Sequence, residues 1–406
     1  MALIGSNIFI GNSIEKTFIG TDRYDATTTP TFVGIMTASD GAANDWFGNS
    51  VAVGNGIIVI GAPFKDGNGQ SVGGAYIFDL DGNQVSIITS PVGIGDLFGD
   101  EVAVGSGKIV FGVGNDLIGS NINQGSVYIY DLDGTNEVKI FASDGAAYDY
   151  FGSSVAVGCG KVVVGAYRDD VGSNNDQGSV YIFDLDGNNE TKITDIDGST
   201  RDQFGASVAV GSGRIVVGAY PTFGGSSGSV HIYDLKGNRL GIITASDVAV
   251  NDTFGHSVAV GSGKIVVGAH GVDVGINTNQ GSAYIYDLDG NQLGIITVSD
   301  GAADDYFGYS VAIGSGRIVI GAYGVDIGSN ANQGAAYIYD LDGNQLGIIT
   351  ASDAAADDRF GHSAAVGSGR IVVGAQYHDI GSNGGQGSAY LFSTPESDHI
   401  LDILDK

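Results

Sequence analysis

The chain has 406 residues, of which 69 are glycine and only 5 are proline, and hydrophobic residues make up 43% of it. Its formal net charge of −29 argues against binding to nucleic acid or to anionic membranes, because both are themselves negative. A single cysteine, Cys159, excludes an internal disulfide framework.

Residues 1–31 precede the regular part of the sequence. They contain the short apolar pieces Ile8–Ile10 and Phe18–Ile19, and the stretch Thr27–Pro30 is typical of a linker. We interpret this segment as an N-terminal extension that packs on the following domain or tethers it to a partner. Met1–Gly20 lacks a basic start and an unbroken apolar run, so no secretory signal is expected. No run of 18 apolar residues predicts a membrane span.

The dipeptide Phe-Gly then recurs seven times at intervals of 50 to 53 residues. In the unit that begins at Phe307, apolar runs bounded by glycine turns predict four strands. These strands are Ser310–Ile313, Arg317–Ala322, Ala335–Asp340 and Gln345–Thr350. Seven such units predict an all-β fold, a seven-bladed β-propeller of four-stranded antiparallel blades.

The two ends of the repeat array complement each other. The last unit stops after its third strand, Ala389–Phe392, whereas an unmatched fourth strand, Phe32–Thr37, precedes the first Phe-Gly. An open solenoid would instead need polar capping units at both ends. We therefore expect the N-terminal strand to complete the last blade of a propeller spanning residues 32–392, which removes two open sheet edges.

Residues 393–406 form a C-terminal tail. Pro395 suits the first position of a helix, and Ile400, Leu401, Ile403 and Leu404 form an apolar stripe among aspartates. The pattern predicts a short helix that docks on the ring or on a neighbouring protein.

The matching Phe307-Gly308 and Gly321-Ala322 pairs, with their counterparts in the other units, resemble the FG-GAP repeat family, which forms the propeller of integrin α-subunits. The resemblance covers about residues 32–392 and implies adhesion, ligand binding or scaffolding, usually outside cells. Integrin-type repeats often hold Ca²⁺ in a D-x-D-x-D-G loop between their first two strands. Here that place holds Gly-Ser-Gly, which is too short to supply six to eight oxygen ligands. The family's calcium sites are not expected, and no cofactor is assigned.

Successive connections between strands lie on alternate sides of a propeller, so its two faces differ. The short turns lie on one side, which we call the turn face. The long loops and the crossings between blades lie on the other, which we call the loop face.

Side chains that flank each Phe-Gly vary from unit to unit and are expected around the mouth of the central channel on the loop face, where specific function can be placed. The candidate ligand-binding residues are Trp46, Asn49, Asp100, Tyr150, Ser153, His256, Tyr306, Tyr309, Arg359 and His362. Aromatic rings beside polar groups suit stacking on a sugar or docking of a protein loop. The alternative is an ordinary rim without a ligand.

Charged residues recur at fixed places in the units. Basic residues after the first turn are expected to pair with the aspartate that ends the third strand of the same blade: Lys108 with Asp131, Lys161 with Asp184, Arg214 with Asp234, Lys264 with Asp287, and Arg317 with Asp340. Aspartates in the long loops and crossings are expected to brace those loops. A metal site assembled from neighbouring crossings is the alternative.

No catalytic motif is evident. The sequence has no HExxH and no G-x-S-x-G, and its six histidines share no metal-binding spacing. We expect a binding or assembly platform rather than an enzyme, located on a virion such as a phage tail or fibre, or outside the cell. Its expected partner is a protein or glycan on a host-cell surface. Alternatives are a purely structural virion component that contacts its neighbours through residues 1–31 and 393–406, and, less favoured, a glycan-processing enzyme.

Overall fold

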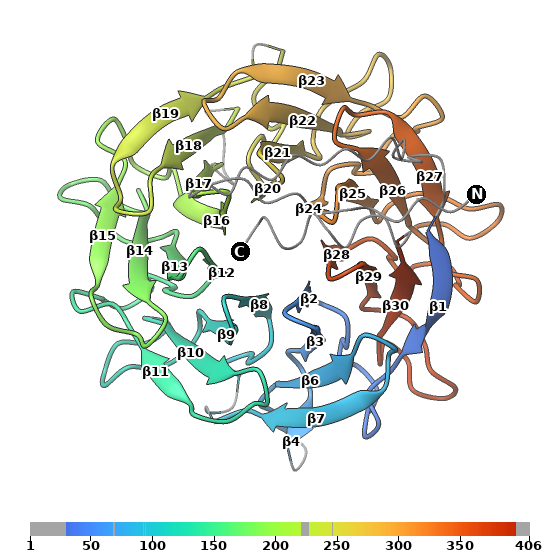
Figure 1. Ribbon diagram of the computed structural model, residues 1–406, viewed down its shortest axis with the longest axis horizontal. Coiled ribbons are helices and arrows are strands. Elements are labelled where there is room, and N and C mark those ends of the chain that lie inside the picture. The colour runs from blue at the N-terminus through green and yellow to red at the C-terminus, as the bar shows by residue number, and fades with distance from the viewer. Residues whose placement is uncertain are drawn as a thin grey trace, which may run out of the picture.

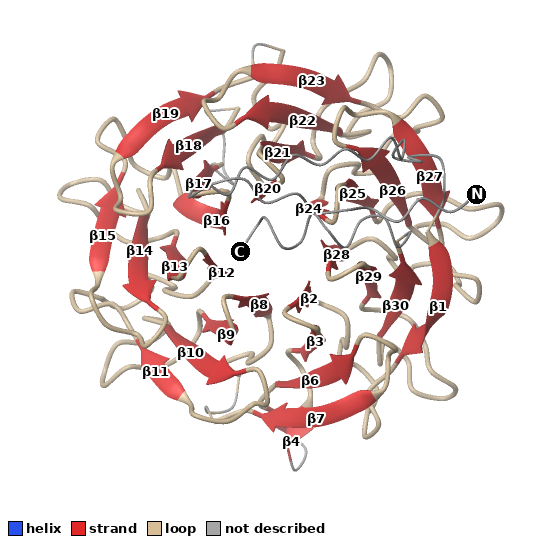
Figure 2. Ribbon diagram, in the orientation of Figure 1, coloured by secondary structure: helices blue, strands red, loops and turns tan. Residues whose placement is uncertain are grey.

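The computed structural model describes residues 30–67, 70–91, 93, 95–220, 227–245 and 247–394. Its strands form seven four-stranded antiparallel sheets arranged as a ring, together with one two-stranded ribbon (Figure 1). Strands and loops are the only elements within these ranges (Figure 2). The expected seven-bladed β-propeller is confirmed. The predicted C-terminal helix and residues 1–29 of the predicted extension lie outside the described residues.

Blades 1 to 6 each run outward from the channel in chain order. Blade 1 contains β2 (Val51–Gly54), β3 (Ile57–Ala62), β6 (Gly74–Asp79) and β7 (Gln84–Thr89), and blade 2 contains β8 (Glu101–Gly105), β9 (Lys108–Val113), β10 (Ser126–Asp131) and β11 (Val138–Ile140). Blade 3 contains β12 (Ser154–Gly158), β13 (Lys161–Ala166), β14 (Ser179–Asp184) and β15 (Thr191–Thr194), and blade 4 contains β16 (Phe204–Gly211), β17 (Arg214–Ala219), β18 (Ser229–Tyr233) and β19 (Arg239–Ile243). Blade 5 contains β20 (Ser257–Gly261), β21 (Lys264–Ala269), β22 (Ser282–Asp287) and β23 (Gln292–Ile296), and blade 6 contains β24 (Ser310–Gly314), β25 (Arg317–Ala322), β26 (Ala335–Asp340) and β27 (Gln345–Ile349). The ribbon, β4 (Asp66–Gly67) with β5 (Gln70–Ser71), lies in the long loop of blade 1.

Blade 7 combines strands from both ends of the described chain. It contains β28 (Ser363–Gly367), β29 (Arg370–Ala375) and β30 (Ser388–Ser393), and its outermost strand is β1 (Thr31–Met36). β1 lies beside β30 at the outside of the ring (Figure 1). The two strands pair antiparallel, with Phe32 opposite Phe392 and Met36 opposite Ala389. The edge of β30 is thereby covered.

The apolar core lies between blades rather than inside one layer. Within the described ranges, seven buried clusters occur, and each joins side chains from two adjacent blades. The phenylalanine of every Phe-Gly pair is fully buried in these clusters. Each blade is therefore held chiefly by its neighbours, which makes the ring one stable unit.

The two glycines of the repeat motif allow this close packing. Gly48, which follows Phe47, has φ near +90°, a backbone that side chains rarely adopt. Gly61, in β3, faces the next blade, and a Cβ atom there would lie 1.9 Å from the carbonyl oxygen of Gly99. The Phe-Gly and Gly-Ala signals thus mark the contacts between blades.

Candidate functional site

The side chains around the channel mouth stand on a repeated backbone frame. The residue before each Phe-Gly pair has a left-handed backbone, with φ between 55° and 60° in all seven blades. In blade 6 the N–H of Tyr306 donates to the carbonyl of Asn279 in the preceding blade, and the N–H of Tyr309 donates to the carbonyl of Tyr306, both at 3.1 Å. Because all seven blades share this conformation, it belongs to the scaffold, and the identity of each side chain is left free.

Rings from blades 4 to 7 form a continuous group on the loop face, which we call the aromatic cluster. Its members are Tyr220, His256, His270, Tyr306, Tyr309, Tyr323 and His362. The ring of His256 lies 4.4 Å from that of His270 and 4.8 Å from that of Tyr309. Tyr309 lies 4.6 Å from Tyr323 and 5.0 Å from His362. All seven side chains are partly exposed, so the cluster presents rings to the solvent.

A cationic side chain extends this cluster toward blade 1. The guanidinium carbon of Arg359 lies 5.3 Å from the ring centre of Tyr323 and 4.8 Å from that of Tyr377. The ring of Tyr377 in turn lies 5.0 Å from Trp46, which packs at 4.2 Å against Phe64. Aromatic and cation–π contacts therefore link five of the seven blades around the channel mouth, from blade 4 to blade 1.

The three histidines of the aromatic cluster are uncharged at neutral pH. Burial lowers the pKa of His256 to about 4, that of His270 to about 3 and that of His362 to about 4. The cluster is thus an apolar and hydrogen-bonding surface, with Arg359 as its cation.

The opposite side of the mouth is hollow and more polar. A cavity of about 470 Å³, which we call the loop-face pocket, spans blades 2 to 4. Side chains that line it include Asp100, Tyr150, Ser153, Tyr167, Arg168 and Gln203. Tyr220 lines the same cavity and contacts His256, so the pocket borders the aromatic cluster.

Acidic residues next to this pocket have unusual protonation behaviour. Confinement within the ring raises the pKa of Asp100, whose carboxylate accepts a hydrogen bond of 3.0 Å from Asn49. The same confinement, with Asp100 beside it, raises the pKa of Glu101 to about 8. Glu101 stands where the other six blades have serine.

The structure divides the ten candidate residues between these two regions. His256, Tyr306, Tyr309 and His362 belong to the aromatic cluster, and Arg359 and Trp46 continue it. Asp100, Tyr150 and Ser153 line the loop-face pocket, and Asn49 touches that pocket through Asp100. A ligand role for each residue stays a prediction.

The sequence analysis did not single out a second set of side chains around the channel mouth. Tyr167, Tyr220, His270 and Tyr323 each follow the Gly-Ala pair that ends the second strand of a blade, and Tyr377 lies one position later. Comparing this position across units would have found them. The candidate residues came only from positions beside Phe-Gly, and this position lies outside them.

Loop aspartates brace their own loops, as expected. The Asp326 carboxylate accepts the N–H of Asn332 at 2.9 Å, and that of Asp305 accepts the N–H of Ala302 at 2.7 Å. Equivalent bonds occur at Asp170, Asp273, Asp379, Asp45, Asp149, Asp202, Asp252 and Asp358. No group of three or more His, Cys, Asp or Glu side chains suited to a metal ion occurs in the described part of the chain.

The expected ion pairs on the turn face form in blades 2 and 3. Lys108 contacts Asp131 and Lys161 contacts Asp184, each at 2.5 Å. The expectation was wrong for Arg214 and Lys264. Arg214 reaches Asp289 of blade 5 at 3.7 Å, and Lys264 reaches Asp342 of blade 6 at 4.0 Å.

The turn sequence explains this difference. Asp287 uses one oxygen to accept the N–H groups of Asp289 and Asn291, and its other oxygen accepts from the Asn291 side chain. Its carboxylate is therefore occupied by its own turn, and Asp234 and Asp340 are engaged in the same way. The turn of blade 2 has the same length, but there the N–H of Thr135 donates to the Asp133 carboxylate instead, which leaves an oxygen of Asp131 for Lys108.

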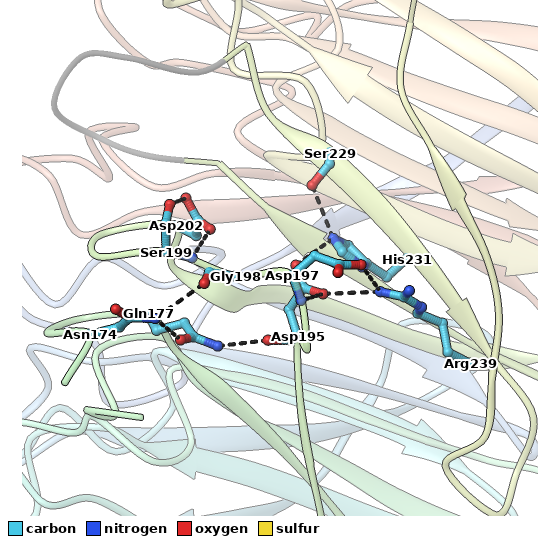
Figure 3. A network of polar contacts seen from close by, with 10 residues as sticks. All are labelled: Asn174, Gln177, Asp195, Asp197, Gly198, Ser199, Asp202, Ser229, His231 and Arg239. Atoms are coloured by element: carbon cyan, nitrogen blue, oxygen red, sulfur yellow. Dashed lines mark hydrogen bonds and ion pairs between the residues drawn. The ribbon is translucent and has the colours of Figure 1, made fainter. Parts of the chain in front are cut away.

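A histidine network at the junction of blades 3 and 4 resembles a hydrolase site in composition only (Figure 3). Nε2 of the buried His231 lies 3.0 Å from the hydroxyl of Ser229 and 3.7 Å from the carboxylate of Asp195. A nucleophile–base relay needs these two partners on opposite ring nitrogens, whereas both face the same one. His231 replaces the tyrosine found here in blade 3, where Tyr181 donates to Asp144, so the network joins neighbouring blades.

Family comparison agrees with this geometry. A family model described as FG-GAP repeat matches residues 30–78, 135–183, 188–233, 239–286, 291–339 and 344–392. The chain belongs to the FG-GAP repeat family. In this FG-GAP protein the buried phenylalanine and the close-packed glycines are the family motif itself, and the resemblance seen in the sequence is confirmed.

The chain also resembles a solved propeller structure outside this family. The chain is similar to the crystal structure of the WD40 beta propeller domain of Doa1, with a TM-score of 0.53 and 12% identity over 91% of this chain and 99% of that one. At that identity the likeness concerns the fold alone. No curated protein matches the chain. In the described ranges, no helix is long and apolar enough to cross a membrane.

Proposed function

We propose that this FG-GAP propeller is a non-catalytic binding platform that recognises a protein or glycan on a cell surface through its loop face. The expected setting is a virion or the outside of a cell, where a rigid, strongly acidic ring stays soluble and carries its partner site on one face.

One observation carries the proposal: the scaffold does not need the rings that form the aromatic cluster. The position after Phe-Gly holds His256, Tyr309 and His362 in blades 5 to 7, but Ser153 and Ala206 in blades 3 and 4. All these blades share the same five residue pairs between their two inner strands, and blade 4 adds one pair, Phe204 with Ala219. Partly exposed tyrosine, tryptophan and arginine at positions that folding leaves free are typical of binding hot spots.

Variants with an internal precedent test this proposal. His256→Ala and Tyr309→Ser give blades 5 and 6 the small residues that blades 4 and 3 already carry, so the ring should still fold. We expect each to weaken binding to intact host cells or to a glycan array by about tenfold or more, because a hot-spot side chain contributes about 2 kcal/mol. Lys236→Ala, on the exposed turn face, is the matched control and should bind as the unchanged chain does. Equal binding by all variants contradicts the proposal.

Removal of residues 1–30 separates recognition from a purely structural role. Retained cell binding by the shortened chain supports recognition by the propeller. Loss of particle incorporation, with no cell binding by either form, supports the structural alternative.

A further inference from the structure

The loop-face pocket exists because small residues stand at positions that aromatic side chains occupy in other blades. The position after Phe-Gly is Ser153 in blade 3 and Ala206 in blade 4, whereas blade 6 has Tyr309 there. Directly after the second strand, blade 2 has Gly114 where blade 6 has Tyr323. All three small residues line the cavity of about 470 Å³. This volume lies in the range of small-ligand sites.

Groups of three chemical kinds converge on this cavity. The guanidinium carbon of Arg168 lies 5.2 Å from the ring centre of Tyr150 and 5.3 Å from that of Tyr167, and the two rings are 5.6 Å apart. Asp96 and Asp100 contribute carboxylates, and Gln203 contributes an amide. The pocket therefore offers aromatic surface, hydrogen-bond donors and hydrogen-bond acceptors within one hollow.

We propose that the loop-face pocket binds an uncharged saccharide. A sugar ring has apolar C–H faces that suit Tyr150 and Tyr167, and its hydroxyls both donate and accept hydrogen bonds. Carboxylates accept from such hydroxyls, whereas the guanidinium of Arg168 donates to them, and hydrogen bonds to charged groups are the stronger kind. This assignment rests on the proposed function and names the ligand class for one part of the loop face.

Charge distinguishes this class from ionic ligands. An anionic sugar meets two aspartates and a net charge of −29. A cationic ligand meets the guanidinium of Arg168 beside Tyr150 and Tyr167. A neutral polyhydroxy ligand meets neither penalty.

The test uses the full chain on an array of neutral, acidic and amino saccharides, followed by calorimetry with the best neutral one. We expect neutral saccharides to bind. Ala206→His, which copies the residue of blade 5, should fill the pocket and weaken that binding by at least about tenfold. Ser153→Tyr, which copies blade 6, is the second filling variant in case the first does not fold. Arg168→Gln should also weaken binding, because it removes a charged donor.

Lys236→Ala, on the turn face, is the control and should bind saccharides as the unchanged chain does. Retained saccharide binding by Lys236→Ala, with loss in Ala206→His, supports the pocket. Retained saccharide binding by Ala206→His, with loss in His256→Ala, overturns the pocket assignment and leaves the binding platform standing. Preference for acidic or amino saccharides, or cell binding without any saccharide binding, also overturns it. If no variant changes binding to cells or saccharides, both proposals fail.

Discussion

The hydroxyl of Tyr309 in blade 6 lies 3.3 Å from Nε2 of His362 in blade 7, so a hydrogen bond joins two blades inside the aromatic cluster. A neutral imidazole nitrogen can accept this bond from the tyrosine, whereas a protonated ring cannot. The low pKa of His362 keeps the ring neutral in the folded protein at physiological pH.

Acid should therefore destabilise the ring through its histidines. An unfolded histidine titrates near pH 6.5, whereas burial lowers the folded pKa of His256 and His362 to about 4. Between these values the unfolded chain binds more protons, so the free energy of unfolding falls as the pH drops from 6.5 to 4, by on the order of 1 kcal/mol per histidine. Urea denaturation across this window should show a shallower decline for His362→Gln than for the unchanged chain. Parallel curves would contradict this linkage.

Glu101 has the opposite pH dependence. Its folded pKa of about 8 lies above the unfolded value, so the folded state binds more protons between about pH 4.5 and 8. Its stabilising contribution is complete below this window and is lost as the pH rises through it. We expect Glu101→Gln to be more stable than the unchanged chain at pH 9 and to lose that advantage near pH 4.5, as measured by thermal unfolding.

Glu101→Ser should add a hydrogen bond to that gain. In other blades the serine at this position donates to a glycine carbonyl of the next blade, at 2.8 Å for Ser154 and 2.9 Å for Ser310. Such a bond contributes about 0.5–1.5 kcal/mol. Glu101→Ser should therefore exceed Glu101→Gln in stability at every pH. Equal stability of the two variants would show that blade 2 does not form this bond.

A methyl group at the family glycine should disrupt the contact between blades. At Gly165, in β13, a Cβ atom would lie 1.9 Å from the carbonyl oxygen of Gly205 in blade 4. We expect Gly165→Ala to lower the free energy of unfolding by about 1–3 kcal/mol or more, because two backbones must separate. Gly294→Ala, in β23, is the matched control: no atom lies within 4 Å of its Cβ position, so it should be neutral or slightly stabilising. Equal effects of the two changes in chemical denaturation would refute the close-contact explanation.

Arg370 connects blade 7 to blade 1 across the point where the ring closes. Its Nε donates to the carbonyl of Leu80 at 2.6 Å, and its guanidinium lies 3.6 Å from the carboxylate of Asp81. Arg370→Ala should cost about 1.5–3 kcal/mol of unfolding free energy, because a charged donor is lost from a partly buried carbonyl. Asp81→Asn should change stability by less than about 1 kcal/mol, since the Asp81 side chain is 80% exposed. A larger loss in Asp81→Asn would show that the ion pair dominates.

Much of the fold was predictable because the repeat is locally encoded. Strands such as Arg317–Ala322 and Ala335–Asp340 have the same bounds in the structure as in the sequence prediction, since glycine turns delimit them on both sides. The ion pairs were less predictable. Whether Lys264 meets Asp287 depends on which N–H groups of the turn after β22 donate to the Asp287 carboxylate. In blade 2 the N–H of Thr135 donates to Asp133 instead, which leaves an oxygen of Asp131 for Lys108.

The sequence by itself determined the seven units, the strands within each unit and the positions beside Phe-Gly that vary, because periodicity and turn chemistry act over a few neighbouring residues. Only the tertiary structure decided that His256 and His270, 14 positions apart, share one aromatic cluster, and that Gly114, Ser153 and Ala206 leave one common cavity. The reason is geometric. Side-chain neighbours around a channel mouth come from different blades, and their distances depend on how the blades pack rather than on their spacing in the chain.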